Sequence, residues 1–143
     1  MPVKIQRQAT DPRSSQIAKF DLLVQALHAE PQLEFAVLVG SRAADTALQK
    51  SDWDIALQWS AGLDWLDVLG KTETLRRKLA KTMCVETADI DLIELRRANL
   101  AMRATVTERG LSLTGENTLA WAHFLTRTWR ELEDYYWAQR RAA

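Results

Sequence analysis

A glycine–serine pair and two aspartates lie close together in the sequence, as Gly40-Ser41 and Asp52-Trp53-Asp54, with ten residues between them. A glycine after a buried strand lets the backbone approach a ligand, and a serine hydroxyl with the free N–H groups of a following helix can hold phosphate oxygens. Two carboxylates two residues apart on a strand point to the same face and can hold a divalent cation. Together, the motifs indicate metal-assisted chemistry on a nucleoside triphosphate.

A third carboxylate, Asp91, is predicted to complete this site. It lies between Ile90 and Leu92 early on an expected strand. An acidic side chain that is even partly buried there is expected to have a binding partner. It can bind the metal under the attacking hydroxyl, or it can accept the proton of that hydroxyl as a general base. Asp89, two residues earlier on the same face of that strand, is the alternative candidate.

Four strands are predicted to position these residues. Residues 35–39 are short, apolar and rich in strand formers, and this strand ends at Gly40. Residues 52–59 alternate, with Trp53, Ile55, Leu57 and Trp59 on a core face and the two aspartates on the other. Residues 88–95 form a third predicted strand, and residues 111–113 form a short edge strand.

Helices are predicted at both ends of the chain and between the strands, over residues 12–30, 42–49, 65–79, 97–108 and 116–141. Asp11 is expected to cap the first of these helices and Asp64 the helix over residues 65–79, which Gly70 is expected to break. The order of elements predicts an α/β or α+β fold with a small mixed sheet of three to four strands flanked by helices. We expect a single domain over residues 1–143, with its core at about 33–113.

Composition restricts the function further. Lys and Arg number 19 and Asp and Glu number 19, so the balanced charge argues against direct nucleic-acid binding. The one cysteine, Cys84, excludes an intramolecular disulfide and a cysteine-based zinc site. No apolar run approaches the roughly 18 residues that a membrane helix needs, and no signal peptide is visible, so a cytoplasmic location without a membrane contact is expected.

With these motifs the chain resembles the minimal nucleotidyltransferases (MNT) of the DNA polymerase beta-like superfamily. The resemblance runs from about residue 33 to residue 113 and is carried by Gly40-Ser41, Asp52-Trp53-Asp54 and Ile90-Asp91-Leu92-Ile93. It implies a polymerase beta-like nucleotidyltransferase fold with a long C-terminal helix added. It also implies transfer of a nucleoside monophosphate from a triphosphate to a hydroxyl, with release of pyrophosphate.

Within that family, the chain is similar to the MntA-type antitoxins, which are encoded beside a HEPN-domain toxin and AMPylate a tyrosine of that toxin with ATP and Mg²⁺. The resemblance implies that the triphosphate is held by Gly40 and Ser41, with Arg42 as a further phosphate contact. It also implies that two Mg²⁺ ions are held by Asp52, Asp54 and Asp91. The chain departs from the family pattern in having Ala43-Ala44-Asp45 where many members have a glycine, and Trp53 between the two aspartates.

Two alternative functions also fit this sequence. On the last helix an apolar stripe is predicted to be core on one side, formed by Trp121, Phe124, Leu125, Trp129, Leu132 and Tyr136. Tyr135 and Trp137 fall off this stripe, and aromatics left over on another side suit a protein interface, so the chain could neutralise a toxin by binding alone. The same site could also serve a small-molecule nucleotidyltransferase, although little sequence is left to build a separate substrate pocket.

Overall fold

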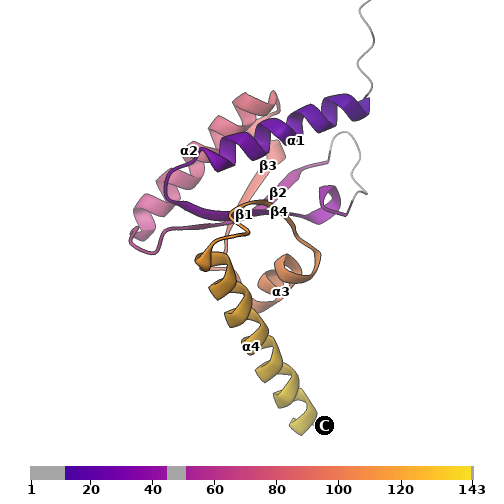
Figure 1. Ribbon diagram of the computed structural model, residues 1–143, viewed down its shortest axis with the longest axis vertical. Helices are drawn as coiled ribbons and strands as arrows, with labels where there is room; N and C mark the ends of the chain where they lie inside the picture. Colours follow the sequence, from indigo (N-terminus) through magenta and orange to yellow (C-terminus); the bar gives the residue numbers. More distant parts are fainter. Residues whose placement is uncertain (1–11, 45–50, 143) are drawn as a thin grey trace, which may run out of the picture.

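The computed structural model describes residues 12–44 and 51–142. In this part of the chain, one mixed sheet lies between two pairs of helices (Figure 1). The strand order is β3-β2-β1-β4, with β1 antiparallel to both neighbours and β2 parallel to β3. The strands are β1 (Leu33–Val39), β2 (Trp53–Trp59), β3 (Ile90–Glu94) and β4 (Leu111–Thr114). The predicted mixed α/β architecture is confirmed, and the edge strand at residues 111–113 is present as β4.

The helices cover both faces of this sheet. One pair, α1 (Pro12–His28) and α2 (Trp65–Met83), lies on one side of it, and the other pair, α3 (Leu100–Arg109) and α4 (Leu119–Ala142), lies on the opposite side (Figure 1). Short 3₁₀ turns follow β1 and precede β3, as η1 (Gly40–Arg42) and η2 (Thr87–Asp89). None of the helices in the described ranges has the length and apolar character needed to cross a bilayer.

Alternation along the strands divides the buried side chains into two cores. On β1, Ala36 and Leu38 pack toward α1 and α2, while Phe35, Val37 and Val39 pack toward α3 and α4. On β2, the predicted core face is confirmed, because its two tryptophans, Ile55 and Leu57 all join the core under α1 and α2. The next residues along β2 therefore face α3 and α4, which puts the aspartate face of this strand on the other side of the sheet.

The parallel pairing of β2 and β3 requires a crossover, which α2 supplies. The Asp64 carboxylate caps this helix by accepting the Asp67 backbone N–H at 2.8 Å, as the sequence predicts. The helix ends at Met83, and the capping residue Cys84 adopts a left-handed conformation with φ of 55°. The break expected at Gly70 is wrong: the helix runs through this exposed glycine, where an added Cβ would meet nothing within 4 Å.

Several predicted boundaries shift because polar side chains cap the elements. The strand expected over residues 88–95 is shorter, since the Asp89 carboxylate accepts the Glu86 N–H at 3.2 Å and closes η2 just before Ile90. The helix expected from residue 97 begins at Leu100, because Asn99 accepts the Met102 N–H at 2.9 Å. Of the helix predicted over residues 42–49, only a 3₁₀ turn and the following turn to residue 44 are described, and residues 45–50 lie outside the described residues, as does the predicted cap Asp11.

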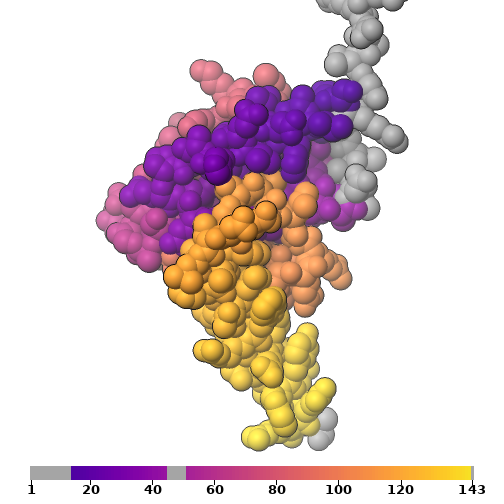
Figure 2. All heavy atoms as spheres, in the orientation of Figure 1, coloured from indigo at the N-terminus to yellow at the C-terminus, as the bar shows by residue number. Residues whose placement is uncertain are grey.

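The long C-terminal helix is present, but the prediction that Trp129 and Tyr136 belong to its core stripe is wrong. Its first turns are anchored by rings of Trp121 and Phe124, whose centroids lie 5.0 and 5.3 Å from that of Phe35. Beyond these turns α4 continues past α3 and away from the sheet (Figures 1 and 2). Trp129 and Tyr136 are consequently each 56% exposed.

Candidate active site

The three predicted aspartates lie at one end of the sheet, where β1 ends and both β2 and β3 begin. In the pairing register, Asp54 lies opposite Val39 of β1 on one side and opposite Asp91 of β3 on the other. Residues paired in register project to the same face of a sheet. The Asp54 and Asp91 side chains are therefore neighbours on the face of α3 and α4, and Asp52 lies just before the start of β2.

Gly40 brings the glycine–serine turn against this carboxylate. Its φ is +75°, and a Cβ added there would lie 2.6 Å from Oδ2 of Asp54. Such a distance leaves no room for a side chain, so a glycine is needed both for the backbone conformation and for the close approach. Ser41 follows directly in η1 and is half-buried. The structure thus brings the two sequence motifs together through the contact between Gly40 and Asp54.

The charges of the neighbouring acids act on the Asp54 carboxyl. Partial burial raises the pKa of the Asp54 carboxyl, and the negative charges of Asp91 and then Asp52 raise it further. A cation between such carboxylates offsets their mutual repulsion and stabilises their ionised forms. The apo site therefore carries a repulsion that a divalent ion would offset.

The donor chemistry of the site fits a hard cation. All three side chains offer carboxylate oxygens, and Mg²⁺ binds through one or two carboxylates together with waters and substrate phosphates. Among the described residues, no group of three or more His, Cys, Asp or Glu side chains is placed to hold a metal ion by itself. An open set of carboxylates that leaves coordination positions for a phosphate-bearing substrate is consistent with both observations.

Arg42 lies next to the site, but its described contacts are with the protein. Nε and Nη2 donate to the Ser51 carbonyl at 3.0 and 2.6 Å, and Nη1 donates to Oε1 of Gln16 at 2.7 Å. The guanidinium carbon lies 4.0 Å from the centre of the Trp53 ring. Burial lowers the pKa of this guanidinium, and the charges of Asp52 and then Asp89 oppose that shift. Sequence reasoning missed this stacking, although the unusual tryptophan between the two aspartates was its signal.

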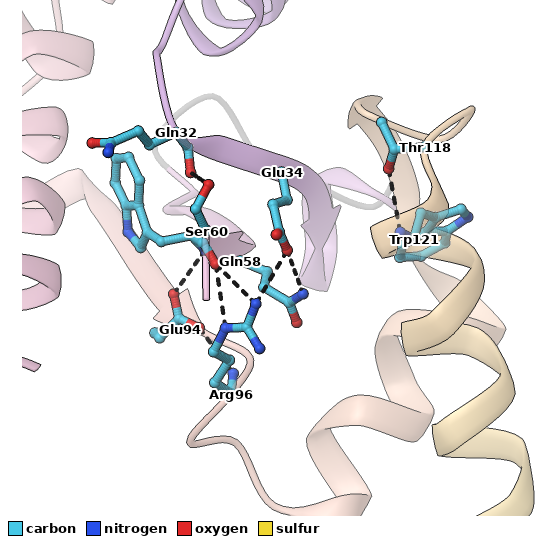
Figure 3. A network of polar contacts seen from close by, with 9 residues as sticks. Gln32, Glu34, Gln58, Ser60, Glu94, Arg96, Thr118 and Trp121 are labelled. Carbon is cyan, nitrogen blue, oxygen red and sulfur yellow. Dashed lines mark hydrogen bonds and ion pairs between the residues drawn. The ribbon is translucent and has the colours of Figure 1, made fainter. Parts of the chain in front are cut away.

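A second polar cluster, which the sequence did not predict, lies at the opposite end of β2 (Figure 3). The Glu94 carboxylate accepts the backbone N–H groups of Trp59 and Arg96, at 3.3 and 2.9 Å. The Arg96 guanidinium donates to the Trp59 carbonyl and to Glu34, which also accepts from Gln58 at 2.7 Å. Burial raises the pKa of the Glu94 carboxyl, against the effect of those two backbone donors. This cluster ties β1, β2 and the segment after β3 together, far from the aspartates.

With this geometry established, comparison with known proteins assigns the family. The family described as Polymerase beta, Nucleotidyltransferase matches residues 22–118, which include both motifs and all three aspartates. The chain belongs to this nucleotidyltransferase family. The match begins within α1 and ends just before α4, so the polymerase beta-like fold is confirmed and α4 follows the matched region.

Solved structures related to this nucleotidyltransferase include toxin–antitoxin complexes. A chain in the crystal structure of a toxin–antitoxin with AMP-PNP is 27% identical, with a TM-score of 0.63, and the alignment covers 86% of this chain and 93% of that one. A chain in the structure of a tri-AMPylated Shewanella oneidensis HEPN toxin in complex with an MNT antitoxin is 25% identical, with a TM-score of 0.60, and the alignment covers 90% and 93%. No curated protein matches the chain.

Proposed function

We propose that this chain is an antitoxin that transfers AMP from ATP to a hydroxyl, that of a tyrosine, on a partner HEPN toxin and thereby neutralises the toxin. The observation that carries the proposal is the pairing of Asp54 with Asp91 beside Gly40 in a chain of this family. The related complexes with AMP-PNP and with a tri-AMPylated toxin support the donor and the acceptor. The proposed setting is the cytoplasm, where ATP is available.

In this proposal, the backbone at Gly40 and the Ser41 hydroxyl hold phosphate oxygens of ATP, while Asp52, Asp54 and Asp91 face the reacting phosphate. Bound Mg²⁺, coordinated by these three carboxylates, would neutralise charge on the triphosphate. The acceptor oxygen attacks the α-phosphorus, the bond from that phosphorus to the bridging oxygen breaks, and pyrophosphate leaves. Asp91 is positioned on the strand next to Asp54 and is our candidate to accept the proton of the hydroxyl.

The direct test is to incubate the purified chain with ATP, Mg²⁺ and the product of its neighbouring gene, and to measure intact mass. We expect the mass of that neighbour to rise by one or more adenylyl increments, and Asp52→Asn to abolish the increase. Asp21→Asn, an exposed aspartate on α1, is the matched control and should leave the increase unchanged. A verified HEPN partner that binds the chain and gains no mass would refute the proposal.

Neutralisation by binding alone is the second candidate function, because of the exposed aromatic side chains that α4 carries after Phe124. Trp129, Tyr135, Tyr136 and Trp137 are between 49% and 57% exposed. Exposed aromatics of this kind are enriched in protein interfaces. Under this alternative, Asp52→Asn and Asp54→Asn would still neutralise the toxin in cells, while substitutions on α4 would not.

A further inference from the structure

The guanidinium of Arg42 is occupied by contacts inside the protein. Each of its three nitrogens donates to a protein oxygen, two of them to the same carbonyl of Ser51 and the third to Gln16. Its flat face lies against the Trp53 ring, 4.0 Å from the ring centre. A planar group that is both bonded at its edge and stacked on its face is held in one orientation.

That orientation directs Arg42 away from the carboxylates on the strands. Trp53 is 3% exposed and packs in the core under α1 and α2, whereas Asp54 follows it on the strand and projects to the face of α3 and α4. The guanidinium stacked on Trp53 therefore lies on the opposite side of β2 from Asp54 and Asp91. A pocket of about 480 Å³ on that side is lined by Arg42, Trp53 and Asp89, together with Lys19, Ser51, Cys84, Val85 and Glu86.

We propose that Arg42 is a positioning residue that holds Asp52 in place relative to the glycine–serine turn. Arg42 itself is part of η1, so its backbone moves with Gly40 and Ser41. The carbonyl that it binds belongs to Ser51, which is joined to Asp52 by the next peptide bond. The Arg42 side chain thus connects the glycine–serine turn directly to the segment that carries Asp52. Its effect on catalysis rests on the proposed function, whereas the connection itself does not.

The same contacts account for the tryptophan between the two aspartates. Trp53 offers a broad, buried ring on which a guanidinium can stack while its edge reaches the Ser51 carbonyl. Lysine cannot replace this arginine, because an ammonium lacks both the planar face and the paired edge donors. Arg42→Lys is therefore a sharper variant than Arg42→Ala: it keeps the charge and removes the geometry.

The kinetic test measures kcat and KM for ATP in the AMP-transfer reaction. We expect Arg42→Lys to lower kcat by about 10- to 100-fold, the usual effect of losing a residue that orients a ligand-holding group. KM for ATP should change by less than about threefold, because the side chain does not bind the phosphates. Arg97→Lys is the matched control, since Arg97 stacks on Trp65 at 3.5 Å after the far end of β3. It should leave both constants unchanged.

A second measurement is independent of catalysis. Amide hydrogen exchange over residues 51–53 should be faster in Arg42→Lys than in the wild type and in Arg97→Lys. If the wild type fails to transfer AMP, the proposed function fails while the exchange experiment still decides the connection. Unchanged exchange at residues 51–53 would overturn the inference. A rise of about tenfold or more in KM for ATP with unchanged kcat would also overturn it, because this result identifies a phosphate contact.

Discussion

Replacing Gly40 with alanine tests the contact on which the site depends. The added Cβ would lie 2.6 Å from Oδ2 of Asp54, and the backbone would keep a φ of +75°. A left-handed conformation costs a residue with a side chain roughly 1–2 kcal/mol. The clash itself falls on the end of a short side chain, so we expect the Asp54 carboxylate to rotate away rather than the sheet to separate. Stability should therefore fall modestly and activity severely.

The expected values follow from these two effects. The free energy of unfolding should fall by about 1–2 kcal/mol, measured by urea denaturation. AMP transfer should fall by about 100-fold or more, because a displacement of about 1 Å at a catalytic group is enough for a loss of that size. Because Asp91 and Asp52 stay in place, we expect ATP still to bind and the loss to fall on kcat. Raising the ATP concentration should therefore not restore the rate of transfer.

Gly70→Ala is the matched control for this substitution. Gly70 is exposed within α2 and has open space where a Cβ would stand. Alanine should raise the free energy of unfolding by up to about 1 kcal/mol there and leave transfer unchanged. If Gly40→Ala kept a wild-type transfer rate, the contact between Gly40 and Asp54 would have no part in the chemistry, and the proposed site would be refuted.

Three further predictions concern charge and exposure. The fold raises the pKa of Asp54 above its usual 3.8, so the metal-free protein should lose stability as pH rises through the raised pKa. Asp54→Asn should lack this loss and melt at a higher temperature at pH 7, and a lower melting temperature would contradict the prediction. Arg103 is 11% exposed and pairs with Glu131, so Glu131→Gln should destabilise by about 1–2 kcal/mol in urea, while Glu133→Gln on the exposed side of α4 should change nothing. Trp137 is 57% exposed, so Trp137→Ala should leave the melting temperature of the isolated chain unchanged but weaken toxin binding at least about fivefold by calorimetry; equal binding would exclude this surface.

The sequence predicted the elements that carry their own local signals. Alternation over residues 52–59 defined the two faces of β2 correctly, and Asp64 marked a real helix start. The break at Gly70 was wrong because α2 buries Val68, Leu75 and Leu79 against the sheet. Packing of that size outweighs the cost of one glycine, about 1 kcal/mol, in a helix.

Features that depend on distant partners were beyond the sequence. The sequence favoured Asp91 as the third carboxylate and left Asp89 as the alternative, and the register of β2 with β3 is what places Asp91 beside Asp54. Asp89, the rival candidate, instead caps η2 through the Glu86 N–H. The stacking of Arg42 on Trp53 also required the fold, because no local pattern indicates which face of β2 an arginine from the preceding turn will choose.

The parallel pairing of β2 with β3 has a consequence for how the protein matures. Asp54 and Asp91 are separated in the chain by the whole of α2, so they meet only after this crossover has docked and the non-local strand pair has formed. A slip of one residue in the pairing would turn Asp91 to the wrong face of the sheet. A newly made chain therefore has no complete aspartate site until the non-local pairing of β2 with β3 has formed. Binding of a metal-nucleotide complex to that site would then stabilise the correct register relative to every slipped register.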